Sequence, residues 1–359
     1  MTKYEKVLNL LEENNTDAVI LYSPENRYWY SRFHSSMGYL IITKKGSYLF
    51  LDGRYITAAR NKTDLQNITE VIHFGKNVWE EMKKVLARDG VKTLGFESDW
   101  VVYNQYQGFD KMFAEQTLVP VNCSKMRMVK EEWELAQIQK ACDITNTVFE
   151  EVVAWVKPGI TEKDLSRFVS DRFFANGADK LSFDTIVASG INGSMPHAVP
   201  TDKVLVEGEL ITLDMGCFYN GYCSDQTRTF VLGNELDAKL QNIYDTVYAA
   251  QSLGLSLVKA GKNAGDIHRE VEKFIAEAGY EGYFDHGLGH GIGVEIHEEP
   301  YENGTSQSIL AENMTITVEP GIYVPGLGGV RIEDDVIVTT EGSKMLTSSP
   351  RELLFINNK

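Results

Sequence analysis

The 359-residue sequence lacks several features that would assign a protein to a class at once. No apolar run approaches the ~20 residues of a membrane-spanning helix. The N-terminal residues carry mixed charges and no apolar core, so no secretory signal peptide is visible. The four cysteines form no CxxC pair, which argues against a zinc finger and against a thioredoxin-type site. We therefore expect a cytoplasmic protein with reduced thiols.

Basic residues are also scarce, since 35 Lys and Arg stand against 51 Asp and Glu, for a net charge of −16. A chain this acidic repels nucleic acids and anionic membrane surfaces, whereas small ligands and metal ions are tolerated. The hydrophobic fraction of 43% and the charged fraction of 24% are those of a globular protein. At ~100–200 residues per domain, the length suggests two domains or one large one.

Two sequence patterns meet at a charged stretch around residues 125–133. Residues 1–125 alternate short apolar strands with helical segments, which predicts an N-terminal α/β domain. Residues 130–359 are expected to form a second domain, in which two helices precede two extended segments and the same order then occurs again. The expected helices are 131–155, 161–175, 236–258 and 264–278, and the expected extended pairs are 209–219 with 222–232 and 315–323 with 330–339.

The internal repeat is visible in the sequence, where Ile-Thr-Leu-Asp-Met-Gly at 211–216 resembles Ile-Thr-Val-Glu-Pro-Gly at 316–321. Each repeat has one carboxylate in its first extended segment and one in its second: Asp214 and Asp225, then Glu319 and Glu333. A charged carboxylate in an apolar segment is unfavourable unless it is paired or bound to a cation. Few basic residues lie nearby beyond Arg228 and Arg331. If the two halves face each other, two divalent cations would balance the four carboxylates.

Three of the seven histidines fall within residues 286–297, in the sequence His-Gly-Leu-Gly-His-Gly-Ile-Gly-Val-Glu-Ile-His. The alternating glycines argue against a helix and allow close approach of the backbone. We therefore expect His286, His290 and His297 to face a site. Four carboxylates and an imidazole favour Mn, Fe, Co or Zn in a two-metal catalytic centre over a structural thiolate zinc site.

These residues resemble the motifs of the pita-bread metallopeptidases, the family that includes methionine aminopeptidase, aminopeptidase P and prolidase. The resemblance rests on Leu-Asp214-Met-Gly, Ser-Asp225-Gln-Thr-Arg-Thr, Gly-His290-Gly-Ile-Gly, Val-Glu319-Pro-Gly and Arg-Ile-Glu333-Asp. It implies that Asp214 binds one metal ion, that His290 and Glu319 bind the other, and that Asp225 and Glu333 bridge both. It also implies an α+β pita-bread catalytic domain with a pseudo-twofold repeat, preceded by a creatinase-like α/β domain.

The resemblance assigns further roles. His197 and His297 match the family's substrate-binding and transition-state histidines, while His286 and Arg331 match substrate-binding positions of its proline-directed branch. Glu319 matches the residue that carries a proton to the leaving nitrogen. The implied reaction is hydrolysis of the Xaa-Pro bond of dipeptides or short peptides, a prolidase activity, by a hydroxide that bridges two metal ions. Mn²⁺ is the expected metal, with Co²⁺ or Zn²⁺ as alternatives.

Three alternative functions stay open at this point. The first is an Xaa-Pro aminopeptidase, or aminopeptidase P, that acts on longer peptides. The others are a metal-free hydrolase of the creatinase kind and a non-catalytic module that binds peptides. Members of these last two groups lose metal ligands, whereas all five ligand positions here hold the expected residue types. The resemblance also implies a homodimer in which the partner's N-terminal domain limits the length of the substrate.

Overall fold

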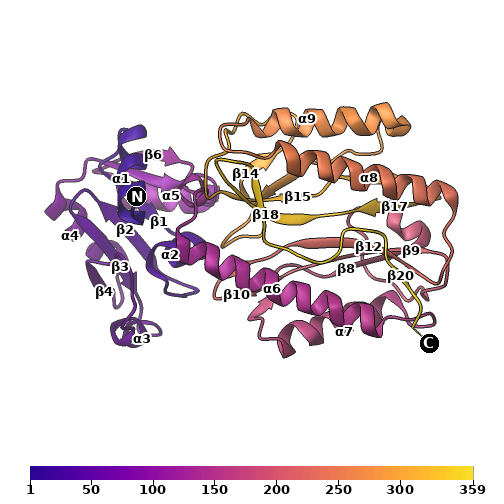
Figure 1. The fold of residues 1–359 in the computed structure, drawn as a ribbon. Helices are drawn as coiled ribbons and strands as arrows, with labels where there is room; N and C mark the ends of the chain where they lie inside the picture. Colours follow the sequence, from indigo (N-terminus) through magenta and orange to yellow (C-terminus); the bar gives the residue numbers. More distant parts are fainter. Residues whose placement is uncertain (359) are drawn as a thin grey trace. The chain divides into compact units, whose positions relative to one another are not determined.

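The computed structural model describes residues 1–358, and the chain divides into two compact units, Met1–Arg127 and Met128–Lys359 (Figure 1). Among the described residues, each unit buries its own apolar side chains, and the second unit contains two separate clusters of them. No described helix has both the length and the apolar character needed to cross a membrane.

The first unit is built on a mixed six-stranded sheet in the order β4-β3-β2-β1-β5-β6. Its strands are β1 (Ala18–Leu21), β2 (Tyr39–Thr43), β3 (Gly46–Leu51), β4 (Glu70–His73), β5 (Thr93–Glu97) and β6 (Thr117–Val121). Its α-helices are α1 (Lys3–Glu13), α2 (Pro24–Ser31), α3 (Ile56–Asn61), α4 (Val78–Asp89) and α5 (Tyr103–Met112). Strand β1 is buried at all four positions because it lies centrally, antiparallel to β2 and parallel to β5. The α/β fold expected for this region is confirmed.

The second unit places two pairs of helices on opposite sides of its strands (Figure 1). The helices are α6 (Glu132–Trp155), α7 (Glu162–Ala175), α8 (Ala238–Leu257) and α9 (Ala264–Ile275). One apolar cluster joins α6 and α7 to the first strands, and the other joins α8 and α9 to the later ones. The two helix pairs therefore enclose the strands that carry the predicted ligands.

The strands of this unit form four sheets. Two larger sheets have the orders β20-β12-β9-β8 and β14-β13-β15-β18-β19, and two smaller ones have the orders β11-β10-β7 and β16-β17. The bounds are β7 (Lys180–Leu181), β8 (Ile186–Ser189), β9 (Leu210–Met215), β10 (Cys217–Tyr219), β11 (Tyr222–Cys223), β12 (Gln226–Leu232), β13 (Gly289–Gly291), β14 (Glu298–Glu302), β15 (Thr315–Val318), β16 (Gly321–Val324), β17 (Gly328–Arg331), β18 (Asp334–Val338), β19 (Ser343–Met345) and β20 (Phe355–Ile356).

The predicted repeat is present in the arrangement of these strands. In the first half β9 pairs antiparallel with β12, and Asp214 lies opposite Thr227. In the second half β15 pairs antiparallel with β18, and Val318 lies opposite Asp334. Each pair follows two helices, so the helix-helix-strand-strand order occurs twice, as the pita-bread fold requires.

The extended segments expected from the sequence are interrupted at three of the four carboxylates. Asp225 lies between β11 and β12, Glu319 between β15 and β16, and Glu333 between β17 and β18. The reason is that their backbone N–H groups donate across to other segments. Asp225 donates to the side chain of Asp335, and Glu333 donates to the carbonyl of Thr227. Strand breaks, rather than strand interiors, therefore position these carboxylates.

Candidate active site

A cavity of about 550 Å³ lies within the unit Met128–Lys359. Its size suits a small peptide, since pockets for small ligands occupy ~300–1,000 Å³. The nine residues that the sequence assigned to the site all line this cavity: His197, Asp214, Asp225, His286, His290, His297, Glu319, Arg331 and Glu333. Their strands and loops come from both halves of the repeat, so the cavity lies where the halves meet.

Buried carboxylate oxygens without hydrogen-bond partners mark the inner end of the cavity. Thr227 donates its hydroxyl to Oε2 of Glu333 at 2.7 Å. Among the described residues, nothing donates to Oε1 of Glu333, Oδ1 of Asp225 or Oδ1 of Asp214. Burial, together with the neighbouring carboxylates, raises the pKa of Asp225 and of Glu333 well above their usual values. Such orphaned acceptors are unfavourable unless a cation or a proton satisfies them.

His290 adds a nitrogen acceptor to the same place. Its Nδ1 lies 3.1 Å from the carbonyl oxygen of Gly291, which can only accept, so Nδ1 carries the proton and Nε2 presents a lone pair. That Nε2 lies 3.7 Å from Oδ2 of Asp225 and 3.5 Å from Oε1 of Glu319. Burial and the nearby His297 lower the pKa of His290 to about 3, so the ring is neutral near pH 7.

The arrangement fits a divalent metal centre. One ligand atom each from Asp225, His290 and Glu333 lies within 4.8 Å of the others. Acceptors converge there without an intervening donor, and carboxylate oxygens with one imidazole suit Mn, Fe, Co or Zn. Asp214 and Glu319 lie in the same cavity and complete the set of residues that could hold metal ions.

Arg331 contributes a guanidinium group to the cavity wall, and this group donates hydrogen bonds to several neighbouring residues. Its Nη2 donates to Oδ2 of Asp214 at 2.7 Å, and its Nε donates to the Thr227 hydroxyl at 3.0 Å. Its Nη1 donates to the Tyr323 hydroxyl at 2.9 Å and to the carbonyl of Pro196 at 3.2 Å. Arg331 therefore orients one oxygen of Asp214 and leaves the other directed at the cavity without a partner.

Tyr323 is a cavity residue that the sequence analysis missed. Its hydroxyl accepts from Arg331 and donates to Nε2 of His286 at 3.0 Å, while Nδ1 of His286 donates to the carbonyl of Gly287 at 2.7 Å. Burial, followed by the charge of Arg331, lowers the pKa of His286 to about 4, so this ring is neutral and can accept. The only signal in the sequence was the place of Tyr323 four residues after Glu319, which says nothing about its partners.

His197 and His297 are the exposed histidines of the cavity wall. His297 directly precedes β14, and its ring centroid lies 4.4 Å from that of His290. Partial burial of its ring and the neighbouring His197 lower the pKa of His297. His197 belongs to a loop between β8 and β9. Both side chains are thus accessible to a ligand in the cavity.

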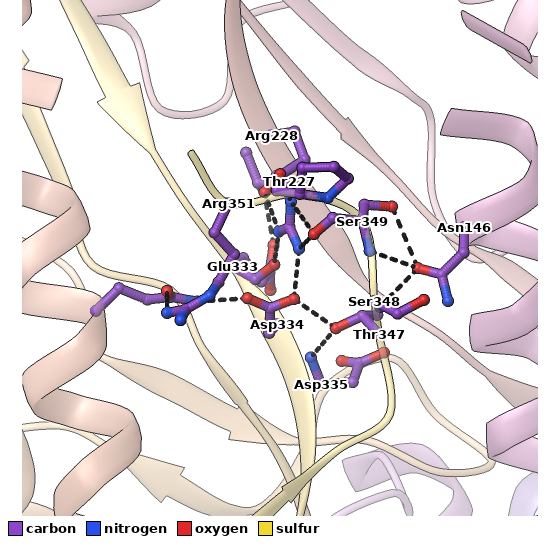
Figure 2. Close-up of polar contacts among 12 residues, drawn as sticks. Asn146, Thr227, Arg228, Glu333, Asp334, Asp335, Thr347, Ser348, Ser349 and Arg351 are labelled. Atoms are coloured by element: carbon purple, nitrogen blue, oxygen red, sulfur yellow. Dashed lines mark hydrogen bonds and ion pairs between the residues drawn. The ribbon is translucent and has the colours of Figure 1, made fainter. Parts of the chain in front are cut away.

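Figure 2 shows what lies beside Glu333, where Arg228 and Asp334 form a buried ion pair. Nη2 of Arg228 donates to Oδ1 of Asp334 at 2.5 Å, and Nη1 donates to the carbonyls of Glu333 at 2.5 Å and Thr227 at 2.9 Å. Asp334 also accepts from Thr347 at 2.6 Å. The sequence analysis counted Arg228 among the basic residues near the four carboxylates, but the structure pairs it with Asp334.

Comparison with known proteins agrees with the fold and the cavity. Residues 136–340 match the model of metallopeptidase family M24, and residues 3–129 match the creatinase/prolidase N-terminal domain. The chain belongs to metallopeptidase family M24.

Individual relatives cover nearly the whole chain. It is 35% identical to the Xaa-Pro dipeptidase of Pyrococcus horikoshii, over 98% of this chain and 98% of that protein. It is 39% identical to a putative Xaa-Pro aminopeptidase of Mycoplasma genitalium, over 95% of each chain. Among solved structures, the Xaa-Pro dipeptidase from Bacillus anthracis superposes with a TM-score of 0.93 at 36% identity, covering 98% of this chain and 99% of that one.

Proposed function

We propose that this chain hydrolyses the Xaa-Pro bond of dipeptides and short peptides as a metal-dependent peptidase. The observation that carries the proposal is the convergence of Asp225, His290 and Glu333, with two buried carboxylate oxygens that have no partner in the described chain. Family membership and the names of the relatives support the same activity.

Two divalent cations are the proposed occupants of the five-residue ligand set Asp214, Asp225, His290, Glu319 and Glu333. When bound, they would supply Lewis-acid activation of a water molecule and of the scissile carbonyl. We propose Mn²⁺ as the native metal because the set is rich in oxygen and contains a single imidazole, with Co²⁺ and Zn²⁺ as alternatives.

The protein's own side chains supply the remaining functions. We assign His297 as a hydrogen-bond donor to the oxyanion that develops on the substrate carbonyl. His197, on the same wall of the cavity, holds the peptide. Glu319 moves a proton to the leaving nitrogen of proline. Arg331 and Tyr323 keep Asp214 and His286 oriented through their hydrogen bonds.

Selection for proline fits the apolar part of the cavity wall. Phe183, Ile186, Ala198, Val199 and Pro200 all line it. An Xaa-Pro bond is a tertiary amide without an N–H, so its recognition depends on shape and apolar contact rather than on a backbone acceptor. These side chains offer that kind of surface.

The test is a turnover assay on protein stripped with a chelator and then supplied with Mn²⁺, Co²⁺ or Zn²⁺. The substrates are an Xaa-Pro dipeptide, an Xaa-Pro-Yaa tripeptide and the matched peptides with alanine in second place. We expect metal-dependent cleavage with a higher kcat/KM for the proline series. The ratio between dipeptide and tripeptide decides between dipeptidase and aminopeptidase. Equal kcat/KM for proline and alanine would contradict proline specificity, and no cleavage with any metal would contradict the activity.

A further inference from the structure

Glu162 is a buried carboxylate outside the cavity, and it has no part in the mechanism above. It is the first residue of α7, directly after the N-cap Thr161, and its exposed fraction is 0%. A negative charge at the N-terminus of a helix is favourable, but a solvent-exposed carboxylate at this position would make the same favourable interaction. The full burial of this side chain therefore calls for another explanation.

The carboxylate of Glu162 accepts hydrogen bonds from both ends of one loop, and Nδ2 of Asn192 lies within reach of both of its oxygens. Oε1 accepts from the backbone N and the hydroxyl of Ser189, both at 2.8 Å, and from Nδ2 of Asn192 at 3.0 Å. Oε2 accepts from the backbone N of Thr201 at 3.0 Å and from its hydroxyl at 2.6 Å. One carboxylate thus joins Ser189, at the end of β8, to Thr201, twelve positions further along the chain.

The loop between these two anchors carries His197. Residues 196–200 line the cavity; Val199 is 78% exposed, whereas Ala198 is buried. Between Ser189 and Thr201 the loop makes two further contacts. The carbonyl of Pro196 accepts from Arg331 at 3.2 Å, and Gly193 packs closely against Gly329. The side-chain hydrogen bonds of Glu162 are therefore one of the constraints on where His197 lies, beside the backbone hydrogen bond from Lys163 to the carbonyl of Thr201.

The charge state of Glu162 agrees with this geometry. Burial alone would raise its pKa, but the hydrogen bonds from Thr201 and Ser189 outweigh burial and lower the pKa below its usual value. The side chain is ionised near pH 7 and acts only as an acceptor. Hydrogen bonds to an ionised acceptor are about twice as strong as neutral ones.

We propose that Glu162 is a positioning residue for substrate binding, because its carboxylate clamps both ends of the loop that holds His197 in the cavity. The proposal rests on the proposed function, in which His197 holds the peptide. It adds a residue on α7 that touches neither the substrate nor the ligand set and still controls the KM.

The first test is Glu162→Gln, which replaces one acceptor oxygen with an NH₂ group facing N–H and O–H donors. We expect kcat/KM for an Xaa-Pro peptide to fall about tenfold or more, mainly through a higher KM, because the lost interaction is one of binding. Glu151→Gln is the matched control, since Glu151 on α6 pairs with Arg172 of α7 and with Asn176, the residue that caps the end of α7. It should stay within about twofold of the wild type.

A double-mutant cycle separates positioning from general damage. If Glu162 acts through His197, then Glu162→Gln should have almost no further effect on kcat/KM in a His197→Ala background. If the fold reductions in kcat/KM of the two single substitutions multiply in the double variant, the proposal is overturned. Thr201→Val removes one donor from an exposed residue, so it serves if Glu162→Gln does not fold. It should raise KM in the same direction by a smaller factor.

Amide hydrogen exchange over residues 190–200 gives a readout that does not depend on activity. Exchange should be faster in Glu162→Gln than in the wild type and unchanged in Glu151→Gln. If the wild type cleaves no Xaa-Pro peptide, the proposed function fails while this comparison still shows whether the clamp exists. Identical exchange in all three proteins, or an unchanged KM in an active Glu162→Gln enzyme, would overturn the proposal.

Discussion

Glu97 in the N-terminal unit and Glu333 in the catalytic unit are both buried, at 0% and 1% exposure, but their surroundings differ. Glu97 accepts from the backbone N–H groups of Tyr22 and Ser23, from the Ser23 hydroxyl and from Nδ2 of Asn26. Both of its oxygens therefore accept hydrogen bonds from neighbouring groups. Glu333 accepts through one oxygen only, from Thr227, and the other oxygen has no partner in the described residues.

This difference shows that burial of a carboxylate does not by itself identify a site. The same contrast occurs one residue along the chain, where Asp334 is buried but accepts from Arg228, Thr347 and Gln251. Satisfied carboxylates stabilise the fold, and orphaned ones that converge with an imidazole call for a cation. The predictions below test this separation.

The largest expected effect is on turnover in Glu333→Ala. With metal in excess, we expect kcat/KM on an Xaa-Pro peptide below about one-thousandth of the wild type, because no described neighbour replaces the lost carboxylate. In the chelated protein the same substitution should not lower Tm appreciably, since loss of the Thr227 hydrogen bond is offset by removal of a buried carboxyl group with one unpartnered oxygen. Near-normal turnover would remove Glu333 from the ligand set.

Asp334→Asn should have the opposite profile. It breaks the buried pair with Arg228 and leaves the guanidinium uncompensated, which costs about 3–5 kcal/mol of unfolding free energy. Urea unfolding of the chelated protein measures this loss directly. A variant as stable as the wild type would contradict the structural role assigned to Asp334.

Glu97→Gln should reduce stability by a smaller amount and leave the chemistry intact. An amide cannot accept from all the donors around Glu97, so we expect a loss of about 1–3 kcal/mol. The kcat on a metal-saturated enzyme should be unchanged. A fall in kcat without a fall in stability would show that satisfied carboxylates also act in catalysis, and the comparison with Glu333 would no longer hold.

The most gradual effect is a pH dependence of stability in the chelated protein. Burial raises the pKa of Glu319 and of Glu302 to about 8, from 4.5 in the unfolded chain. Between pH 4.5 and 8 the folded state keeps protons that the unfolded state releases. The contribution of these two groups to the free energy of unfolding therefore falls as pH rises from 4.5 to 8. His286, with its pKa lowered to about 4 from 6.5, acts in the opposite direction but only below pH 6.5.

The unfolding free energy of the chelated protein should therefore fall between pH 6.5 and 8, by up to ~1.4 kcal/mol per pH unit for each carboxyl group. Urea titrations at several pH values measure this slope. Saturating Mn²⁺ should reduce it, because a bound cation keeps Glu319 ionised, whereas Glu302 lies outside the proposed ligand set. A slope that is the same with and without metal would assign it to groups outside the site.

The sequence predicted the repeat and the residue types of the ligand set because the motifs around Asp214 and Glu319 are local and similar. It could not predict which arginine serves which carboxylate. Arg228 and Arg331 both lie near acidic residues in the sequence, and the tertiary structure pairs one with Asp334 and the other with Asp214, while breaks in the strands place Asp225 and Glu333. Those breaks depend on hydrogen bonds between segments more than a hundred residues apart.

The role of Tyr323 and the clamp at Glu162 were equally beyond the reach of sequence patterns. The sequence places Glu162 near the start of the helix expected over 161–175, and its five donors come from residues 27 to 39 positions away. Local patterns predict elements and capping, whereas the partners of a buried side chain depend on tertiary packing.

The central claim is that the orphaned carboxylates hold two divalent cations, and calorimetric titration of the chelator-stripped protein with Mn²⁺ tests it most directly. We expect two ions per chain in the wild type and in Glu97→Gln, and a higher Tm in the presence of Mn²⁺. At a hundredfold excess over Kd, binding at one site raises the free energy of unfolding by ~2.7 kcal/mol. The double variant Asp225→Asn, Glu333→Gln should lose most of this binding. No binding to the wild type, or the same two ions in the double variant, would contradict the account.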